Sequence, residues 1–109
     1  MTFELHDVAQ ELLAEAATRT DGRATRMLVG HHGEPLHQLA LALRAGAELS
    51  EHANPGQATL QVLQGSVTMR GTAEVTVGPG GLVVIPDEPH SVVAHEASVV
   101  LLTLAHRVP

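Results

Sequence analysis

Between residues 26 and 106 the chain consists of short apolar runs, most of them alternating apolar with polar residues, separated by turns rich in Gly and Pro. A period of two indicates β-strands, because successive side chains of an extended strand point to opposite faces. The expected strands are 27–29, 37–44, 58–63, 66–69, 73–77, 82–85, 90–94 and 98–106. Gly71 lies in a short hairpin connection, where a positive φ is favoured. About eight short strands with glycine turns predict an all-β barrel or jelly roll.

Residues 7–18 follow a different period. They are strong helix formers with apolar side chains at helical spacing, and Asp7 stands where an N-cap residue is expected. The pattern predicts one short amphipathic α-helix ahead of the strands. A length of 109 residues is typical of one folded unit. We therefore divide the chain into an N-terminal helical segment, residues 1–25, and a β-barrel, residues 26–109.

The composition excludes several kinds of chemistry. The chain has no Cys, Lys, Tyr or Trp, which excludes thiolate, Schiff-base and phenolic mechanisms and leaves His, Asp, Glu, Arg, Ser, Thr and bound metal. A net charge of −6 with six basic residues argues against nucleic acid, whose phosphates require a basic surface. There is no signal-peptide pattern and no apolar run of about 18 residues, so we expect a cytoplasmic protein without membrane contact.

A first stretch places a histidine at a defined distance from glycine. Gly46 is followed after five residues by His52, Ala53 and Asn54, and Gly65 closes the next alternating run. Residues two apart on a strand point the same way, so His52 and Asn54 are expected to face one barrel interior together.

A second stretch repeats this arrangement later in the chain. Gly80 is followed after five residues by Pro86, and the loop after Pro86 leads to His90. If the two stretches form neighbouring strands, His90 reaches the same interior as His52. The pattern therefore predicts that these two histidines meet inside the barrel.

The two stretches resemble the two sequence motifs that mark cupins, which are double-stranded β-helix barrels, and the resemblance covers residues 26–106. It implies a cupin barrel, and homodimers are common in that family. It also implies a metal site, since cupins hold a metal ion with two histidines and a glutamate of the first motif and one histidine of the second. By position, His52 and His90 match this set, Asn54 replaces the second histidine, and Ala58 replaces the glutamate.

Two classes of function follow from this resemblance. In the first, His52, His90 and Asn54 hold one divalent ion whose open coordination positions act on a small molecule. Zn, Ni, Cu, Fe and Mn all remain candidates, although a set rich in imidazole and lacking carboxylate favours Zn, Ni or Cu. In the second, the chain is a non-catalytic cupin that has lost the metal set and serves as a small-ligand-sensing or structural module.

The remaining histidines are weaker candidates. His37 shares a strand face with the apolar Leu39 and Leu41 and is a secondary candidate for the barrel interior. Gln57 is expected to point outward, because alternation directs Ala58 inward. The histidines expected to be exposed or locally hydrogen-bonded are His6, His31, His32, His95 and His106. The apolar last strand, 99–104, is expected to pair copies of the chain or to meet another partner.

Overall fold

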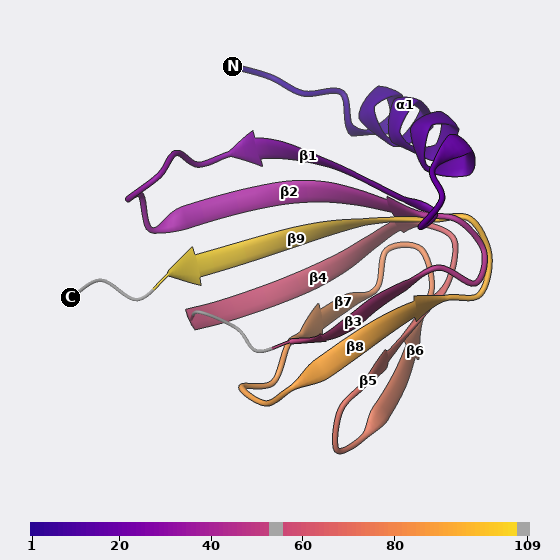
Figure 1. Cartoon of the computed structure of the whole chain (residues 1–109). Coiled ribbons are helices and arrows are strands. Elements are labelled where there is room, and N and C mark those ends of the chain that lie inside the picture. Colours follow the sequence, from indigo (N-terminus) through magenta and orange to yellow (C-terminus); the bar gives the residue numbers. More distant parts are fainter. Residues whose placement is uncertain (53–55, 107–109) are drawn as a thin grey trace.

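Figure 1 shows two sheets facing each other, with one α-helix against the outside of the larger sheet. The structure is a computed structural model that describes residues 1–52 and 56–106, with the backbone alone at residues 51 and 52. The elements are α1 (Leu5–Thr18), β1 (Arg23–Val29), β2 (Leu36–Leu43), β3 (Glu48–His52), β4 (Gly56–Gln64), β5 (Val67–Arg70), β6 (Glu74–Val77), β7 (Leu82–Val84), β8 (His90–Ala94) and β9 (Ser98–His106).

All pairings between the described strands are antiparallel. The larger sheet has the order β1-β2-β9-β4-β7, and the smaller sheet has the order β3-β8-β5-β6. Strands that follow each other in sequence often lie in opposite sheets, as β8 and β9 do. This crossing between two antiparallel sheets is the jelly-roll arrangement. The prediction of an all-β barrel with one N-terminal helix is confirmed.

The main core lies between the two sheets and follows the alternation of the sequence. On β4, Ala58, Leu60 and Val62 are buried, whereas Gln57 and Gln61 are exposed. The inward direction of Ala58 and the outward direction of Gln57 are therefore as predicted. The other buried members of this core are Leu41, Leu43, Val67, Met69, Ile85, Val92, Ala94 and Val100. Aliphatic side chains fill the interior, and only one end of it carries a buried histidine, His90, among the described residues.

Helix α1 covers the outer face of the larger sheet. Val8, Leu12 and Ala16 pack against small residues of the sheet, which include Ala40 and Ala42 on β2. Small side chains at these strand positions allow the helix to approach the sheet closely. In the described part of the chain, no helix is both long and apolar enough to cross a membrane.

The predicted N-cap at Asp7 is wrong. The helix begins at Leu5 after Glu4, and no side chain makes a capping hydrogen bond there. Asp7 lies in the first turn, where a negative charge is favourable at the positive end of the helix dipole without any capping contact. Strand β1 also begins earlier than expected, at Arg23, because residues from Arg23 onward pair with β2.

The predicted positive φ at Gly71 is also wrong. Gly71 is absent from the glycines with positive φ, and its N–H donates to the carbonyl of Ala73 within a three-residue connection. A Cβ at this position would lie 2.6 Å from Oε1 of Glu88, so a larger residue would displace the Glu88 side chain. That carboxylate accepts hydrogen bonds from the backbone N–H of Thr72 at 3.1 Å and from its hydroxyl at 3.0 Å. Glu88 thus stabilises the β5–β6 turn through these hydrogen bonds.

Arg44, just after β2, donates hydrogen bonds to the free carbonyl groups at the C-terminal end of α1. Its Nη1 donates to the carbonyl of Arg19 at 2.9 Å, and its Nη2 lies 3.4 Å from the carbonyl of Thr20. The last turn of the helix itself contains no basic residue. The guanidinium therefore supplies both hydrogen bonds and positive charge where the helix dipole is negative.

We expect Arg44→Met to lower the free energy of unfolding by about 1 kcal/mol, because the helix-end carbonyls lose a charged donor. Urea unfolding followed by circular dichroism measures the change. Arg70→Met is the matched control, because the ion pair of Arg70 with Glu74, at 3.5 Å, is exposed, and such pairs contribute little. Equal effects of the two substitutions would contradict the capping role.

Candidate functional site

His90 points into the barrel at one of its ends. It is the first residue of β8 and is 1% exposed. On this strand Val92 and Ala94 are buried as well, whereas Ser91 and Val93 between them are partly exposed. Val92 and Ala94 belong to the core between the sheets, so alternation places the His90 ring on the inner face.

The backbone before His90 holds its imidazole in one tautomer. Nδ1 lies 2.9 Å from the carbonyl oxygen of Glu88. A carbonyl oxygen only accepts hydrogen bonds, so Nδ1 carries the hydrogen and, in the neutral ring, Nε2 carries the lone pair. Metal-binding histidines commonly donate their second ring N–H to a carbonyl in this way, which fixes the ring orientation. His90 therefore has the tautomer that a ligand coordinating through Nε2 requires.

The fold brings the two histidine stretches together. His52, the last residue of β3, is the cross-strand partner of His90 in the pairing of β3 with β8. Residues opposite each other on antiparallel strands are nearest neighbours across the sheet. The side chain of His52 and the whole of Asn54 lie outside what the structure describes. Ligation by His52, His90 and Asn54 stays a prediction.

At the positions that the resemblance assigns to metal ligands, the described residues supply imidazole but no carboxylate. Ala58, at the position of the family glutamate, is 4% exposed and packs in the core. The Glu88 carboxylate accepts hydrogen bonds from Thr72 and is therefore not placed as a metal ligand. Among residues with described side chains, no three His, Asp or Glu form a group that could hold a metal ion. The donors fit an imidazole-bound ion and do not fit a site of two histidines and one carboxylate.

His37 lies at this same end but contacts another histidine. Its ring centroid is 4.5 Å from that of His106, with an angle of 64° between the ring planes. Both residues continue the inward faces of their strands, since Leu41 on β2 and Val100 on β9 are core residues at matching alternation. His37 was a secondary candidate for the interior, whereas His106 was expected to be exposed or locally hydrogen-bonded and instead contacts the His37 ring. The available signal was the spacing of His106 from Leu104, because residues two apart on a strand point to the same face.

The other histidines agree with the expectation of exposed or locally bonded side chains. His6, His31 and His32 are exposed. His95 is also exposed, and its Nε2 makes a short hydrogen bond with the hydroxyl of Thr68. None of these four residues shares the inner face on which His90 lies.

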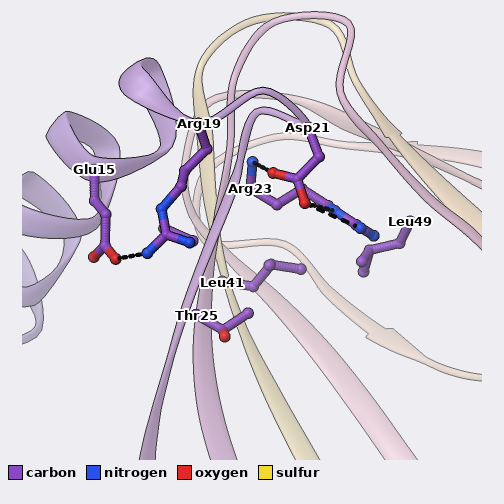
Figure 2. A pocket seen from close by; sticks show the side chains of 8 residues that line it. Glu15, Arg19, Asp21, Arg23, Thr25, Leu41 and Leu49 are labelled. Carbon is purple, nitrogen blue, oxygen red and sulfur yellow. Dashed lines mark hydrogen bonds and ion pairs between the residues drawn. The ribbon is translucent and has the colours of Figure 1, made fainter.

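Figure 2 shows a pocket of about 270 Å³ at the edge of the larger sheet, with charged side chains above a floor that includes Leu41. Two ion pairs border it, Arg19 with Glu15 and Arg23 with Asp21. The Arg23 backbone N–H and guanidinium hold the pKa of the Asp21 carboxyl below its ordinary value. Among the residues with described side chains, no histidine lines this pocket, and each of the two arginines already has a carboxylate partner.

Comparisons with known proteins support the fold. No protein-family model matches the sequence, and no curated protein matches it. Among solved structures, a cupin superfamily protein from Desulfitobacterium hafniense has a TM-score of 0.74 at 14% identity, over 84% of this chain and 87% of that chain. An RmlC-like cupin from Desulfovibrio desulfuricans has a TM-score of 0.65 at 27% identity, over 76% and 81% of the two chains.

A much longer enzyme contains the same fold. Salicylate 1,2-dioxygenase from Pseudaminobacter salicylatoxidans has a TM-score of 0.76 at 18% identity, over 91% of this chain but 33% of that chain. At such low identity the similarity concerns the fold alone. Together with the two facing antiparallel sheets, these similarities show that the chain has the cupin fold, an all-β double-stranded β-helix barrel, with one N-terminal α-helix.

Proposed function

We propose that this cupin binds one divalent transition-metal ion at the end of its barrel through His52 and His90, with Asn54 as a neutral oxygen donor. A small molecule occupies the coordination positions that the protein leaves open. The observation that carries the proposal is His90. Its imidazole is buried, with 1% exposed, and its Nδ1–H donates to the Glu88 carbonyl, while His52 is its cross-strand partner in the pairing of β3 with β8.

The donor set decides which ions suit the site. Two imidazoles and an amide oxygen favour Zn, Ni or Cu over Fe or Mn, which prefer more carboxylate. A bound ion of this kind supplies Lewis-acid polarisation of an oxygen atom on the small molecule. The protein's own contribution is to orient His90 through Glu88, at the end of a core of aliphatic side chains.

A second candidate function rests on Ala58. Its methyl group packs in the core where the family glutamate would stand, so the chain lacks one of the usual ligands. A cupin that has lost its metal set would use the barrel to bind a small organic ligand or to support a partner. The two candidates differ in metal content, which makes metal analysis the decisive measurement.

The test is elemental analysis by mass spectrometry of tag-free protein after dialysis against metal-free buffer. We expect nearly one ion per chain in the wild type, and a loss of at least about tenfold in His52→Ala and in His90→Ala, because each removes an imidazole ligand. His6→Ala is the matched control, since His6 is exposed on the first turn of α1.

Folding of each variant is checked by circular dichroism and urea unfolding, because His90 is buried. Metal lost from a folded His52→Ala protein supports the site even if His90→Ala is unstable. Wild-type protein that neither retains nor takes up Zn, Ni or Cu would contradict the metal proposal and favour the non-catalytic candidate.

The cytoplasmic location and the homodimer stay predictions. Residues 99–104, which were expected to pair copies, lie on β9 between β2 and β4, so both edges of that strand are already paired. For the homodimer we propose instead the outer face of β7 in the same sheet, where Leu82 and Val84 are 62% and 76% exposed. Apolar side chains exposed next to each other on a sheet face are typical of protein contacts.

A further inference from the structure

The contact between His37 and His106 is a second feature at the histidine-bearing end of the barrel. Figure 1 shows the start of β2, the end of β9 and the start of β8 at the same end of the molecule. His37 and His106 come from the larger sheet, whereas His90 belongs to the smaller one. The pair therefore lies on the other sheet from the site proposed above.

The distance between the ring centroids of His37 and His106 is close to the distance expected for two imidazoles that bind the same ion. When two imidazoles bind one ion with metal–nitrogen bonds of about 2.0–2.1 Å, their ring centres lie roughly 4.5–5.2 Å apart at bond angles of about 90–110°. The observed centroid separation is 4.5 Å. A shared ion therefore requires reorientation of the rings rather than separation of the strands.

The tautomer of His37 is also set by the backbone. Its Nε2 lies 2.8 Å from the carbonyl oxygen of Glu34, which only accepts, so Nε2 carries the hydrogen and the neutral ring has its lone pair on Nδ1. A ring N–H donated to a carbonyl is the usual outer contact of a metal-binding histidine. His37 and His90 thus share this feature, on different sheets and through opposite ring nitrogens.

The loop before β2 is shaped around the pair. Gly30 has a φ of +112°, and a Cβ there would lie 2.9 Å from Cγ of His37 and 2.7 Å from the carbonyl oxygen of Leu36. At the other ring, the backbone N–H of His106 donates to the carbonyl of Pro35 at 2.7 Å. The same loop therefore positions both histidines, and only glycine fits where it passes His37.

We propose that His37 and His106 bind a second divalent transition-metal ion, with water completing its coordination. His37 coordinates through Nδ1. With two protein ligands this site is weaker than one with three, and Cu²⁺ binds it more tightly than Ni²⁺ or Zn²⁺ because imidazole sites follow the Irving–Williams order. The proposal does not depend on metal binding at His52 and His90.

The experiment uses the full chain with His52→Ala and His90→Ala combined, so that the first proposed site is absent. Cu²⁺ is added to this protein, with calorimetry for stoichiometry and affinity, and electron paramagnetic resonance for nitrogen ligands. We expect one Cu²⁺ per chain with imidazole nitrogen coordination. Adding His37→Gln or His106→Gln should weaken binding at least about tenfold, because one of two protein ligands is lost.

His32→Gln is the matched control, since His32 lies exposed in the loop that precedes His37. Thermal unfolding of the metal-free variants shows whether each remains folded, and His106→Gln, near the end of β9, serves if His37→Gln unfolds. Should the double variant be unfolded, the same Gln substitutions are compared in wild-type protein as the loss of one bound Cu²⁺. Unchanged Cu²⁺ affinity in both folded Gln variants, or an equal loss in His32→Gln, would overturn the proposal.

Discussion

Gly65→Ala should unfold the barrel at a much lower denaturant concentration than the wild type. Gly65 has a φ of +90°, and a Cβ there would lie 2.2 Å from Oγ of Ser98 and 2.6 Å from the carbonyl oxygen of Ala97. A left-handed residue with a Cβ costs about 1–2 kcal/mol, and overpacking a buried position adds about 1–3 kcal/mol. The added methyl group therefore has to displace backbone as well as a side chain.

The displaced hydroxyl also has a structural role. Ser98 is fully buried, and its Oγ accepts a hydrogen bond from the Ser66 N–H at 3.0 Å and donates to the carbonyl of Glu96 at 2.7 Å. Disturbing such a buried group costs about a further 1–3 kcal/mol. We expect a total loss of about 3–8 kcal/mol, a large part of the roughly 5–15 kcal/mol that stabilises a typical domain.

Gly46→Ala is the control that separates the cost of a positive φ from the cost of crowding against Ser98. Gly46 has nearly the same φ, +84°, but no heavy atom lies within 4 Å of a Cβ built there. This control should lose only the backbone contribution of about 1–2 kcal/mol. Urea unfolding of both variants measures the difference. If Gly65→Ala is no less stable than Gly46→Ala, the contact with Ser98 is relieved by small movements and the expected crowding is wrong.

Ala58→Glu should make the stability of the protein depend on metal. Ala58 is 4% exposed and faces the interior opposite Leu104 of β9. Without metal, an added carboxyl group there overpacks the core and loses hydration, and we expect a loss of about 2–5 kcal/mol. With Zn²⁺, the same group restores the carboxylate that the family site contains. This expectation rests on the proposed metal site at His52 and His90.

The expected result with metal is a rise in thermal stability that increases with Zn²⁺ concentration, because an ion that binds only the folded state stabilises it by mass action. The Zn²⁺ affinity should rise at least about tenfold over the wild type, since a charged ligand is added to neutral ones. Calorimetry measures the affinity, and thermal unfolding with and without Zn²⁺ measures the stability.

Two variants control for charge and for crowding. Gln57→Glu places the same carboxylate on the adjacent, exposed residue of β4, where we expect neither destabilisation nor tighter Zn²⁺ binding. Ala58→Gln crowds the core in the same way without adding charge, and should be destabilised with little rescue by Zn²⁺. Equal Zn²⁺ affinity in Ala58→Glu and Gln57→Glu would mean that the ion does not bind beside Ala58.

The local pattern of the chain was sufficient for much of the fold. Alternation predicted which residues of β4 face the interior, because a strand has one side-chain period and a buried face allows only one register. Three motif glycines, Gly46, Gly65 and Gly80, all have positive φ, which is a property of the local backbone. The errors occurred at Asp7 and Gly71, where packing and a contact distant in sequence replaced the expected local reason.

The sequence by itself determined the all-β class, since a side-chain period of two depends only on neighbouring residues. The cupin fold, the inward direction of His90 and the meeting of the two histidine stretches were expected from the resemblance of these stretches to the cupin motifs, and β3 pairs with β8 as that resemblance implies. Only the tertiary structure decided which distant groups meet. Examples are Glu88 on Thr72, Arg44 at the end of α1, and His37 beside His106. These contacts depend on strand order and register, which arise from burying both sheet faces at once and cannot be read from any single segment.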